Sequence, residues 1–208
     1  MNDTPTYDPA TLRRTVAWVA ALNLGYFFVE IVVAVAIGSV SLFADSVDFL
    51  EDFAVNTLIF VALGWSLAAR SRMGKVMAVI ICAPAVAALW QAIEKFSAPV
   101  PPEPLSLLIT AGGAIVVNAV CAWLLARYRH AGGSMSTAAF LAARNDVIAN
   151  AAIIVMGLIT WATRSGWPDI VLGLIIAALN LSAAKEVWEA ATEEDLAAKA
   201  LEGDFDDD

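Results

Sequence analysis

Long apolar stretches dominate this chain of 208 residues and limit what it can fold into. A helix of roughly 20 mostly apolar residues crosses the hydrocarbon layer of a bilayer. Such stretches lie at residues 15–37, 40–66, 76–96, 105–126, 137–162 and 168–188. Hydrophobic residues make up 60% of the sequence, more than is usual in a soluble domain. We therefore predict an all-α membrane protein with six transmembrane helices in the lipid bilayer. We expect neither an enzyme nor a nucleic-acid partner.

The connections between these stretches are marked by polar, Gly-rich or Pro-rich segments. We expect "ARSRMGK" (69–75) to separate the second and third helices and "SAPVPPEP" (97–104) to separate the third and fourth. The segments "RYRHAGGS" (127–134) and "RSGWPD" (164–169) end the fourth and fifth helices in the same way. The sequence thus predicts six helices joined by short connections.

Basic residues set the expected orientation. Nine of them flank one side of the six stretches and two flank the other, which is a strong positive-inside bias. We therefore predict a multi-pass protein of the inner (plasma) membrane, with residues 1–14 and the C-terminus in the cytoplasm. Tryptophans near the stretch ends are typical of interfacial belts. The nine basic residues are Arg13, Arg14, Arg70, Arg72, Lys75, Arg127, Arg129, Lys185 and Lys199, and the tryptophans are Trp18, Trp65, Trp123, Trp167 and Trp188.

The net charge of −9 comes from one end of the chain. From Glu186 onward there are ten acids and one base, and the remainder is neutral overall. We expect residues 189–208 to extend the last helix and then fray into an acidic, disordered cytoplasmic tail, because so polar a segment has little apolar surface to bury. The alternative is that this tail binds a partner or collects metal ions.

The segment "SLFADSVDFLEDF" (41–53) places four carboxylates inside a predicted span. A carboxylate at the bilayer centre costs about 2.5–3.5 kcal/mol, so such residues usually mark an ion path or a paired charge. Asp45, Asp48 and Asp52 are three and four residues apart and form one helical stripe, whereas Glu51 lies on a neighbouring stripe. Glu30 is a further acid in the first stretch.

The fifth stretch offers matching polar groups. Asp146 and Asn150 are four residues apart and share a helix face. The expected depths of Asp48, Asp52, Asp146 and Asn150 bring them together near the midplane if the second and fifth helices are neighbours. Carboxylates so close cannot all stay ionised without a cation, so the cluster would bind a divalent metal ion or protons. The alternative is that these acids pair with Arg144 or bond to the backbone.

Other polar residues have simpler interpretations. Asp45 lies near the start of its helix, where a capping role competes with a place at the mouth of an ion path. For Glu51 and Arg144, a mutual ion pair or a helix contact is the simpler account. Cys82 and Cys121 have no metal-type spacing, and His130 lies in a connection, so we read the thiols as packing groups and the imidazole as a surface group.

Several motifs, in order, resemble one transporter family. The first stretch has Asn23 and Glu30 in "NLGYFFVEIVVAVAIGSVSL", and "GSVSLFADSVDFLED" is similar to a GS…LxADxxHxxxD pattern. A basic Arg- and Gly-containing segment, Asn118 in the fourth stretch and "GWPD" (166–169) follow. Residues 12–192 thus resemble the cation diffusion facilitator family of divalent-metal transporters. The resemblance implies a bundle of the first, second, fourth and fifth helices, with the third and sixth set apart. It also implies metal ligands at Asp48, Asp52 and Asp146.

Two features depart from the family pattern. Ala142 stands where a histidine is usual, four residues before Asp146, so the site would hold only oxygen ligands, completed by Asn145 or Asn150. Oxygen ligands suit Mn²⁺, Mg²⁺ or Fe²⁺ better than Zn²⁺, and Zn, Mn, Fe, Co or Ni remain candidate substrates. The family's cytoplasmic domain is also absent from this sequence, so we expect any homodimer to form through membrane helices.

The sequence therefore predicts a divalent-cation transporter that exchanges metal ions for protons by alternating access, without a permanently bound cofactor. Asp48, Asp52, Asp146 and Asn150 would hold the cation. The side chains expected to support them or to line the way in are Asp45, Asn145, Glu51 and Glu30. The alternative is a non-transporting protein on the same scaffold that acts as a partner subunit.

Overall fold

The computed structural model describes residues 9–62, 66–128 and 133–202. These residues form helices and no strands, so the prediction of an all-α protein is confirmed for them. Trp65, His130 and the last acidic residues, from 203 onward, lie outside the described part. The helices are α1 (Pro9–Ile37), α2 (Val40–Ala62), α3 (Leu67–Phe96), α4 (Pro104–Ala126), α5 (Gly133–Thr163) and α6 (Trp167–Glu202).

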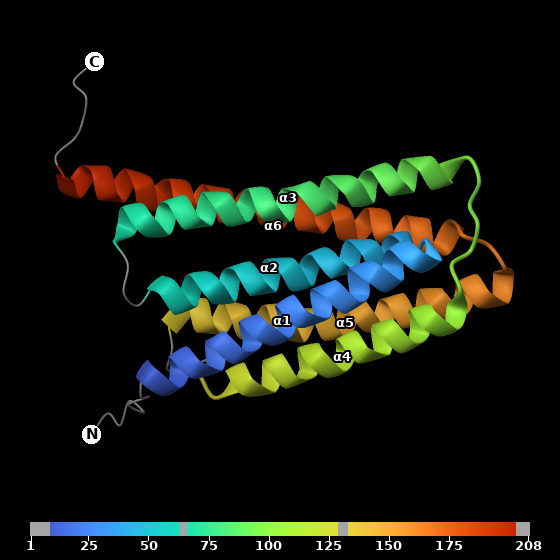
Figure 1. The fold of residues 1–208 in the computed structure, drawn as a ribbon, viewed down its shortest axis with the longest axis horizontal. Coiled ribbons are helices and arrows are strands. Elements are labelled where there is room, and N and C mark those ends of the chain that lie inside the picture. The colour runs from blue at the N-terminus through green and yellow to red at the C-terminus, as the bar shows by residue number, and fades with distance from the viewer. Residues whose placement is uncertain (1–8, 63–65, 129–132, 203–208) are drawn as a thin grey trace, which may run out of the picture.

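Helix α2 occupies the centre of the arrangement. It contacts α1, α3, α5 and α6, while α4 packs against α1 and α5. Helices α3 and α6 run side by side along one edge of the molecule, next to the group formed by α1, α2, α4 and α5 (Figure 1). This is the division that the family resemblance implies. Its consequence is that residues on α2 are enclosed by neighbouring helices.

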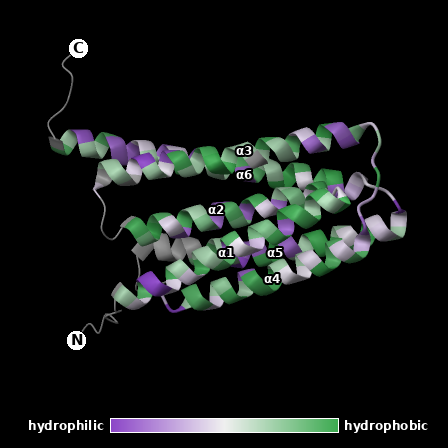
Figure 2. Ribbon diagram, in the orientation of Figure 1, coloured by the Kyte–Doolittle hydropathy of each residue, from purple (hydrophilic) through white to green (hydrophobic). Residues whose placement is uncertain are grey.

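Within the described residues, five of the six helices are long and apolar enough to cross a membrane, namely α1, α3, α4, α5 and α6. Helix α2 has the same length as α4, 23 residues, but its four carboxylates set it apart. Large apolar side chains cover the outward faces of the helices, including Trp18 at 68% exposure and Trp123 at 67%. Figure 2 shows hydrophobic residues along most of each helix and hydrophilic ones gathered toward the C-terminal end of α6. Such a surface suits contact with lipid.

Helix α3 begins earlier than the sequence predicted. The basic segment at 69–75, expected as a connection, forms the first turns of α3. The hydroxyl of Ser66 caps this helix by accepting a hydrogen bond from the backbone N–H of Ala69. The early start reflects packing on α6, because Gly74 faces Ala191 so closely that an added Cβ would lie 2.7 Å from it.

Helix α6 continues beyond the expected sixth span, as one helix to Glu202. The helical extension predicted beyond the sixth span is therefore present and runs through residues 189–202. Two causes are visible in the packing. Ala191 and Ala198 are buried, and Asp195 forms an ion pair with Lys75 of α3 at 3.3 Å.

The connection between α3 and α4 falls at the predicted Pro-rich segment. Glu103 caps α4, with Pro104 at the start of the helix, and its carboxylate accepts hydrogen bonds from the N–H groups of Leu105 and Ser106. Hydrogen bonds from the Ser106 side chain and backbone, and from the Leu105 backbone, lower the pKa of Glu103.

Candidate functional site

The acidic stripe of α2 lies inside the helix group. Asp45 is fully buried and Asp52 is 6% exposed, whereas Asp48 and Glu51 are half-buried. Helix α2 contacts α1 on one side and α5 on another, so the stripe is lined by polar residues from both helices. Two separate sets of hydrogen bonds result.

The first set holds Asp52. The side-chain amide of Asn23, on α1, donates to Asp52 Oδ2 at 3.3 Å. The thiol of Cys121, on α4, donates to Asn23 Oδ1 at 3.8 Å, which fixes the orientation of that amide. Asn56 donates to the backbone carbonyl of Asp52 at 2.8 Å. Neither Asn23 nor Cys121 is among the site residues predicted from the sequence, although Asn23 belongs to one of the motifs in the first stretch. Cys121 is therefore more than a packing group.

The second set holds Asp45. Asn150 Nδ2, on α5, donates to Asp45 Oδ1 at 3.3 Å and to the backbone carbonyl of Asp146 at 3.0 Å. Glu30, on α1, is fully buried and lies beside Asp45. Asn150 thus pairs with the first acid of the stripe, and its hydrogen bonds do not reach Asp48 or Asp52.

Asp146 of α5 faces the same stripe. It lies within electrostatic range of Asp45, Asp48, Glu51 and Asp52. Yet among the described residues no three or more His, Cys, Asp or Glu side chains come close enough together to hold a metal ion. The structure thus brings Asp146 into the neighbourhood of Asp48 and Asp52, and binding would require their side chains to move closer.

Three other expectations turn out differently. Asp45 is fully buried inside α2, so it neither caps the helix nor sits at an exposed mouth. Both Glu51 and Arg144 lie in the described part of the chain and form no ion pair with each other, so of the two predicted alternatives a helix contact remains. Instead Arg144 donates to Asn145 Oδ1 at 3.2 Å on the exposed face of α5, so Asn145 does not reach the cluster.

Comparison with known proteins decides the family. Residues 16–193 match the family described as "Cation efflux transmembrane domain". The chain belongs to the cation diffusion facilitator family. The zinc transporter ZitB of Escherichia coli (strain K12) is 25% identical over 186 residues, and ZitB of Shigella flexneri matches equally well. The alignment covers 82% of this chain and 58% of each relative. The resemblance drawn from the motifs is therefore confirmed.

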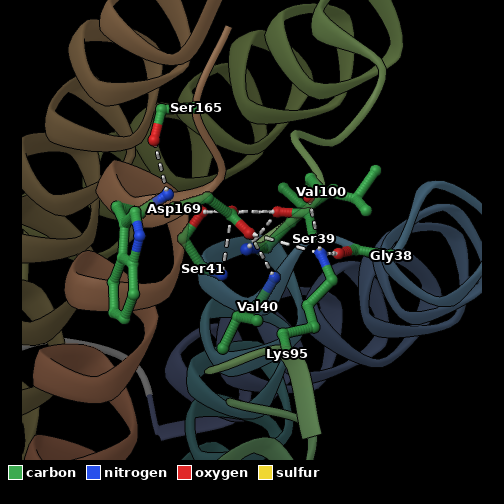
Figure 3. Close-up of polar contacts among 10 residues, drawn as sticks. Gly38, Ser39, Val40, Ser41, Lys95, Val100, Ser165 and Asp169 are labelled. Carbon is green, nitrogen blue, oxygen red and sulfur yellow. Dashed lines mark hydrogen bonds and ion pairs between the residues drawn. The ribbon is translucent and has the colours of Figure 1, made fainter. Parts of the chain in front are cut away.

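For this cation diffusion facilitator domain, sequence reasoning missed one buried carboxylate. Asp169, in the first turn of α6, is 1% exposed and caps the start of α2 (Figure 3). Asp169 Oδ1 accepts hydrogen bonds from the hydroxyls of Ser39 at 2.6 Å and Ser41 at 2.7 Å. Its Oδ2 accepts from the backbone N–H of Val40 at 2.8 Å. The signal that the sequence offers for this residue is the segment "GWPD" (166–169), which resembles the family pattern.

Lys95 completes this cap from α3. Its ammonium lies 4.0 Å from Asp169 Oδ2 and also donates to the carbonyl of Gly38, which has a positive φ of 65°. Figure 3 shows Lys95 approaching Asp169 and Gly38 from the end of α3. Lys95 and Asp169 therefore hold the N-terminal end of α2 against α3 and α6, close to the acidic stripe.

Proposed function

We propose that this chain carries a divalent metal cation across the inner membrane in exchange for protons, by alternating access. The supporting observation is that Asp48 and Asp52 on the enclosed helix α2 face Asp146 on the contacting helix α5. We take six membrane spans with both termini in the cytoplasm, and any homodimer forming through membrane helices, as parts of this proposal.

The chemistry follows from the charge of the cluster. Carboxylates held close together in a low-dielectric site repel one another, so they favour a bound cation or bound protons. A divalent metal ion held by Asp48, Asp52 and Asp146 would compete with protons for the same oxygens. That competition couples the two flows, because arrival of one species releases the other. Asn150 would add an amide oxygen after turning from Asp45.

The ligand set bears on the choice of metal. Asp48, Asp52, Asp146 and Asn150 supply only oxygen, which suits hard or borderline ions such as Mn²⁺. The two relatives are named zinc transporters, so Zn²⁺ is the natural comparison ion. A metal panel that includes Mn²⁺, Fe²⁺, Co²⁺, Ni²⁺ and Zn²⁺ identifies the substrate.

The test uses purified protein in proteoliposomes with a pH reporter inside. We expect a divalent cation to enter or leave only with a counter-flow of protons. The Asp48→Asn and Asp52→Asn variants should abolish both flows. Glu94→Gln is the matched control, because the side chain of this exposed α3 residue accepts its hydrogen bond from Trp90 of the same helix. It should transport like the unaltered chain.

Two results would contradict parts of this proposal. If unaltered vesicles move no divalent cation under a proton gradient, the transport proposal fails and the non-transporting alternative stands. Metal flux without any change in internal pH would instead contradict proton exchange and leave the metal transport intact.

A further inference from the structure

A second group of buried oxygens lies along α2, closer to the α1–α2 turn than Asp48 and Asp52. It consists of Glu30 on α1, Asp45 on α2 and Asn150 on α5, and we call it the Glu30 cluster. All three residues are 0% exposed. The carboxyl groups of Glu30 and Asp45 are immediate neighbours, and Asn150 reaches Asp45 at 3.3 Å.

The cluster contains acceptor atoms with no donor. No N–H or hydroxyl group among the described residues donates a hydrogen bond to either carboxylate oxygen of Glu30, to Oδ2 of Asp45 or to Oδ1 of Asn150, and all four atoms are buried. The amide of Asn150 already donates to Asp45 Oδ1 and to the Asp146 carbonyl, which leaves its oxygen unpaired. A buried polar group without a partner destabilises the fold, and a buried charged group without a partner destabilises it more.

Two hydroxyl groups near the Glu30 cluster donate their hydrogen bonds to backbone carbonyls instead. The hydroxyl of Tyr26, close to both Glu30 and Asp45, donates to the backbone carbonyl of Thr110 at 2.6 Å. The hydroxyl of Ser46 donates to the carbonyl of Phe43 at 2.6 Å. Carboxylate and amide oxygens that lack protein donors form the ligand type that hard divalent cations prefer.

We propose that Glu30, Asp45 and Asn150 form a second divalent-cation site, built only from oxygen ligands and supplied by α1, α2 and α5. The site is distinct from Asp48, Asp52 and Asp146, although Asn150 can serve either set. Its role in transport rests on the function proposed above: a cation would pass between the two sites along α2. The binding itself does not depend on transport.

Binding is measured best where the first site has been removed. Purified Asp48→Asn/Asp52→Asn protein is titrated with Mn²⁺, and free Mn²⁺ is followed by electron paramagnetic resonance. We expect this variant still to bind one Mn²⁺ per chain. Adding Glu30→Gln and Asp45→Asn should weaken that binding at least about tenfold, because two of the three ligands of the second site lose their charge. Adding Glu94→Gln instead should leave it unchanged.

A variant with only one further substitution is included, because several substitutions together can prevent folding. Glu30→Gln alone, in the Asp48→Asn/Asp52→Asn background, preserves the side-chain volume and should still weaken Mn²⁺ binding. Circular dichroism and size-exclusion chromatography check that each variant is folded. The proposal is overturned if the Asp48→Asn/Asp52→Asn protein binds no Mn²⁺, or if Glu30→Gln leaves its affinity unchanged. The latter would show that a shared proton, rather than a metal ion, satisfies Glu30 and Asp45.

The two proposals fail separately. If unaltered vesicles show no metal flux but the Glu30 cluster binds Mn²⁺, the transport function is wrong and the second site stands. If flux is normal and Glu30→Gln changes neither flux nor binding, the second site is wrong and transport stands.

Discussion

Asp169 caps a helix to which it does not belong: its Oδ2 lies 2.8 Å from the backbone nitrogen of Val40, the first residue of α2. Orphan N–H groups at a helix start need acceptors, and the positive end of the helix dipole favours a carboxylate there. The acidic helix α2 is thereby attached to α6 at one end, which fixes where its carboxylates stand relative to α1 and α5.

Removing this cap should destabilise the fold. We expect Asp169→Ala to cost about 3 kcal/mol, because it leaves buried N–H and hydroxyl donors without an acceptor. Asp169→Asn should lose less, since its amide oxygen still accepts. Thermal denaturation in detergent, followed by circular dichroism, measures the difference. Asp195→Ala is the control: it breaks only partly exposed ion pairs, worth about 0–1 kcal/mol. Equal losses for Asp169→Ala and Asp195→Ala would contradict the capping role.

The approach of α6 to α2 depends on Gly173. A Cβ added there would lie 2.6 Å from the carbonyl carbon of Val40 and 2.7 Å from the nitrogen of Ser41. Gly173→Ala should therefore cost about 1–3 kcal/mol through overpacking. Gly112→Ala, where nothing lies within 4 Å, should instead stabilise α4 by about 0.5–1 kcal/mol. The two melting temperatures should shift in opposite directions; a shift in the same direction would refute the close contact.

Asn23 should set the affinity of the cation site through Asp52. Asn23→Ala removes the amide that holds Asp52 Oδ2, and loss of such a supporting partner typically weakens metal binding about 10–100-fold. Cys121→Ala, which removes only the thiol behind Asn23, should have a smaller effect. Mn²⁺ titration of the purified variants gives the series. Unchanged affinity in Asn23→Ala would mean that Asp52 is positioned by other contacts.

Position 142 should control metal preference. Ala142 lies on α5 one turn before Asp146, where the family pattern has a histidine. Ala142→His adds an imidazole nitrogen, so we expect the ratio of Zn²⁺ to Mn²⁺ transport to rise, because zinc favours nitrogen ligands. Competitive flux in proteoliposomes measures this ratio. Ala151→His, on an exposed face of α5, should leave the ratio unchanged. The prediction fails if both variants behave alike.

The start of α4 should be sensitive to acid. Hydrogen bonds from Ser106 and Leu105 lower the pKa of Glu103, so the folded state favours the carboxylate. The stabilising cap is present above the ordinary carboxyl pKa and is lost as pH falls through the lowered value. Nuclear magnetic resonance titration of Glu103 should show this, and Ser106→Ala should raise its pKa toward the ordinary range. An unchanged midpoint in Ser106→Ala would rule out the hydrogen bond from the Ser106 hydroxyl as a cause, since alanine keeps the backbone N–H donor.

The sequence by itself determined the helices and the acidic stripe. Apolar length and helical periodicity are local properties, so α2 and the stripe of Asp45, Asp48 and Asp52 could be predicted without a fold. The residue at which α3 begins and the residue at which α6 ends could not be predicted, because each helix is extended by its packing on the other. The sequence predicted a helical extension of α6, and packing on α3 accompanies that extension as far as Glu202.

Only the tertiary structure decided which polar groups meet. The sequence grouped Asn150 with Asp48, Asp52 and Asp146, yet packing of α5 on α2 brings its amide to Asp45. In the same way, Asp169 reaches the start of α2 across 129 residues of chain. Helical spacing states which side chains share a face, but the rotation and offset of neighbouring helices select their partners. That selection comes from packing along the whole length of each helix, which no single motif contains.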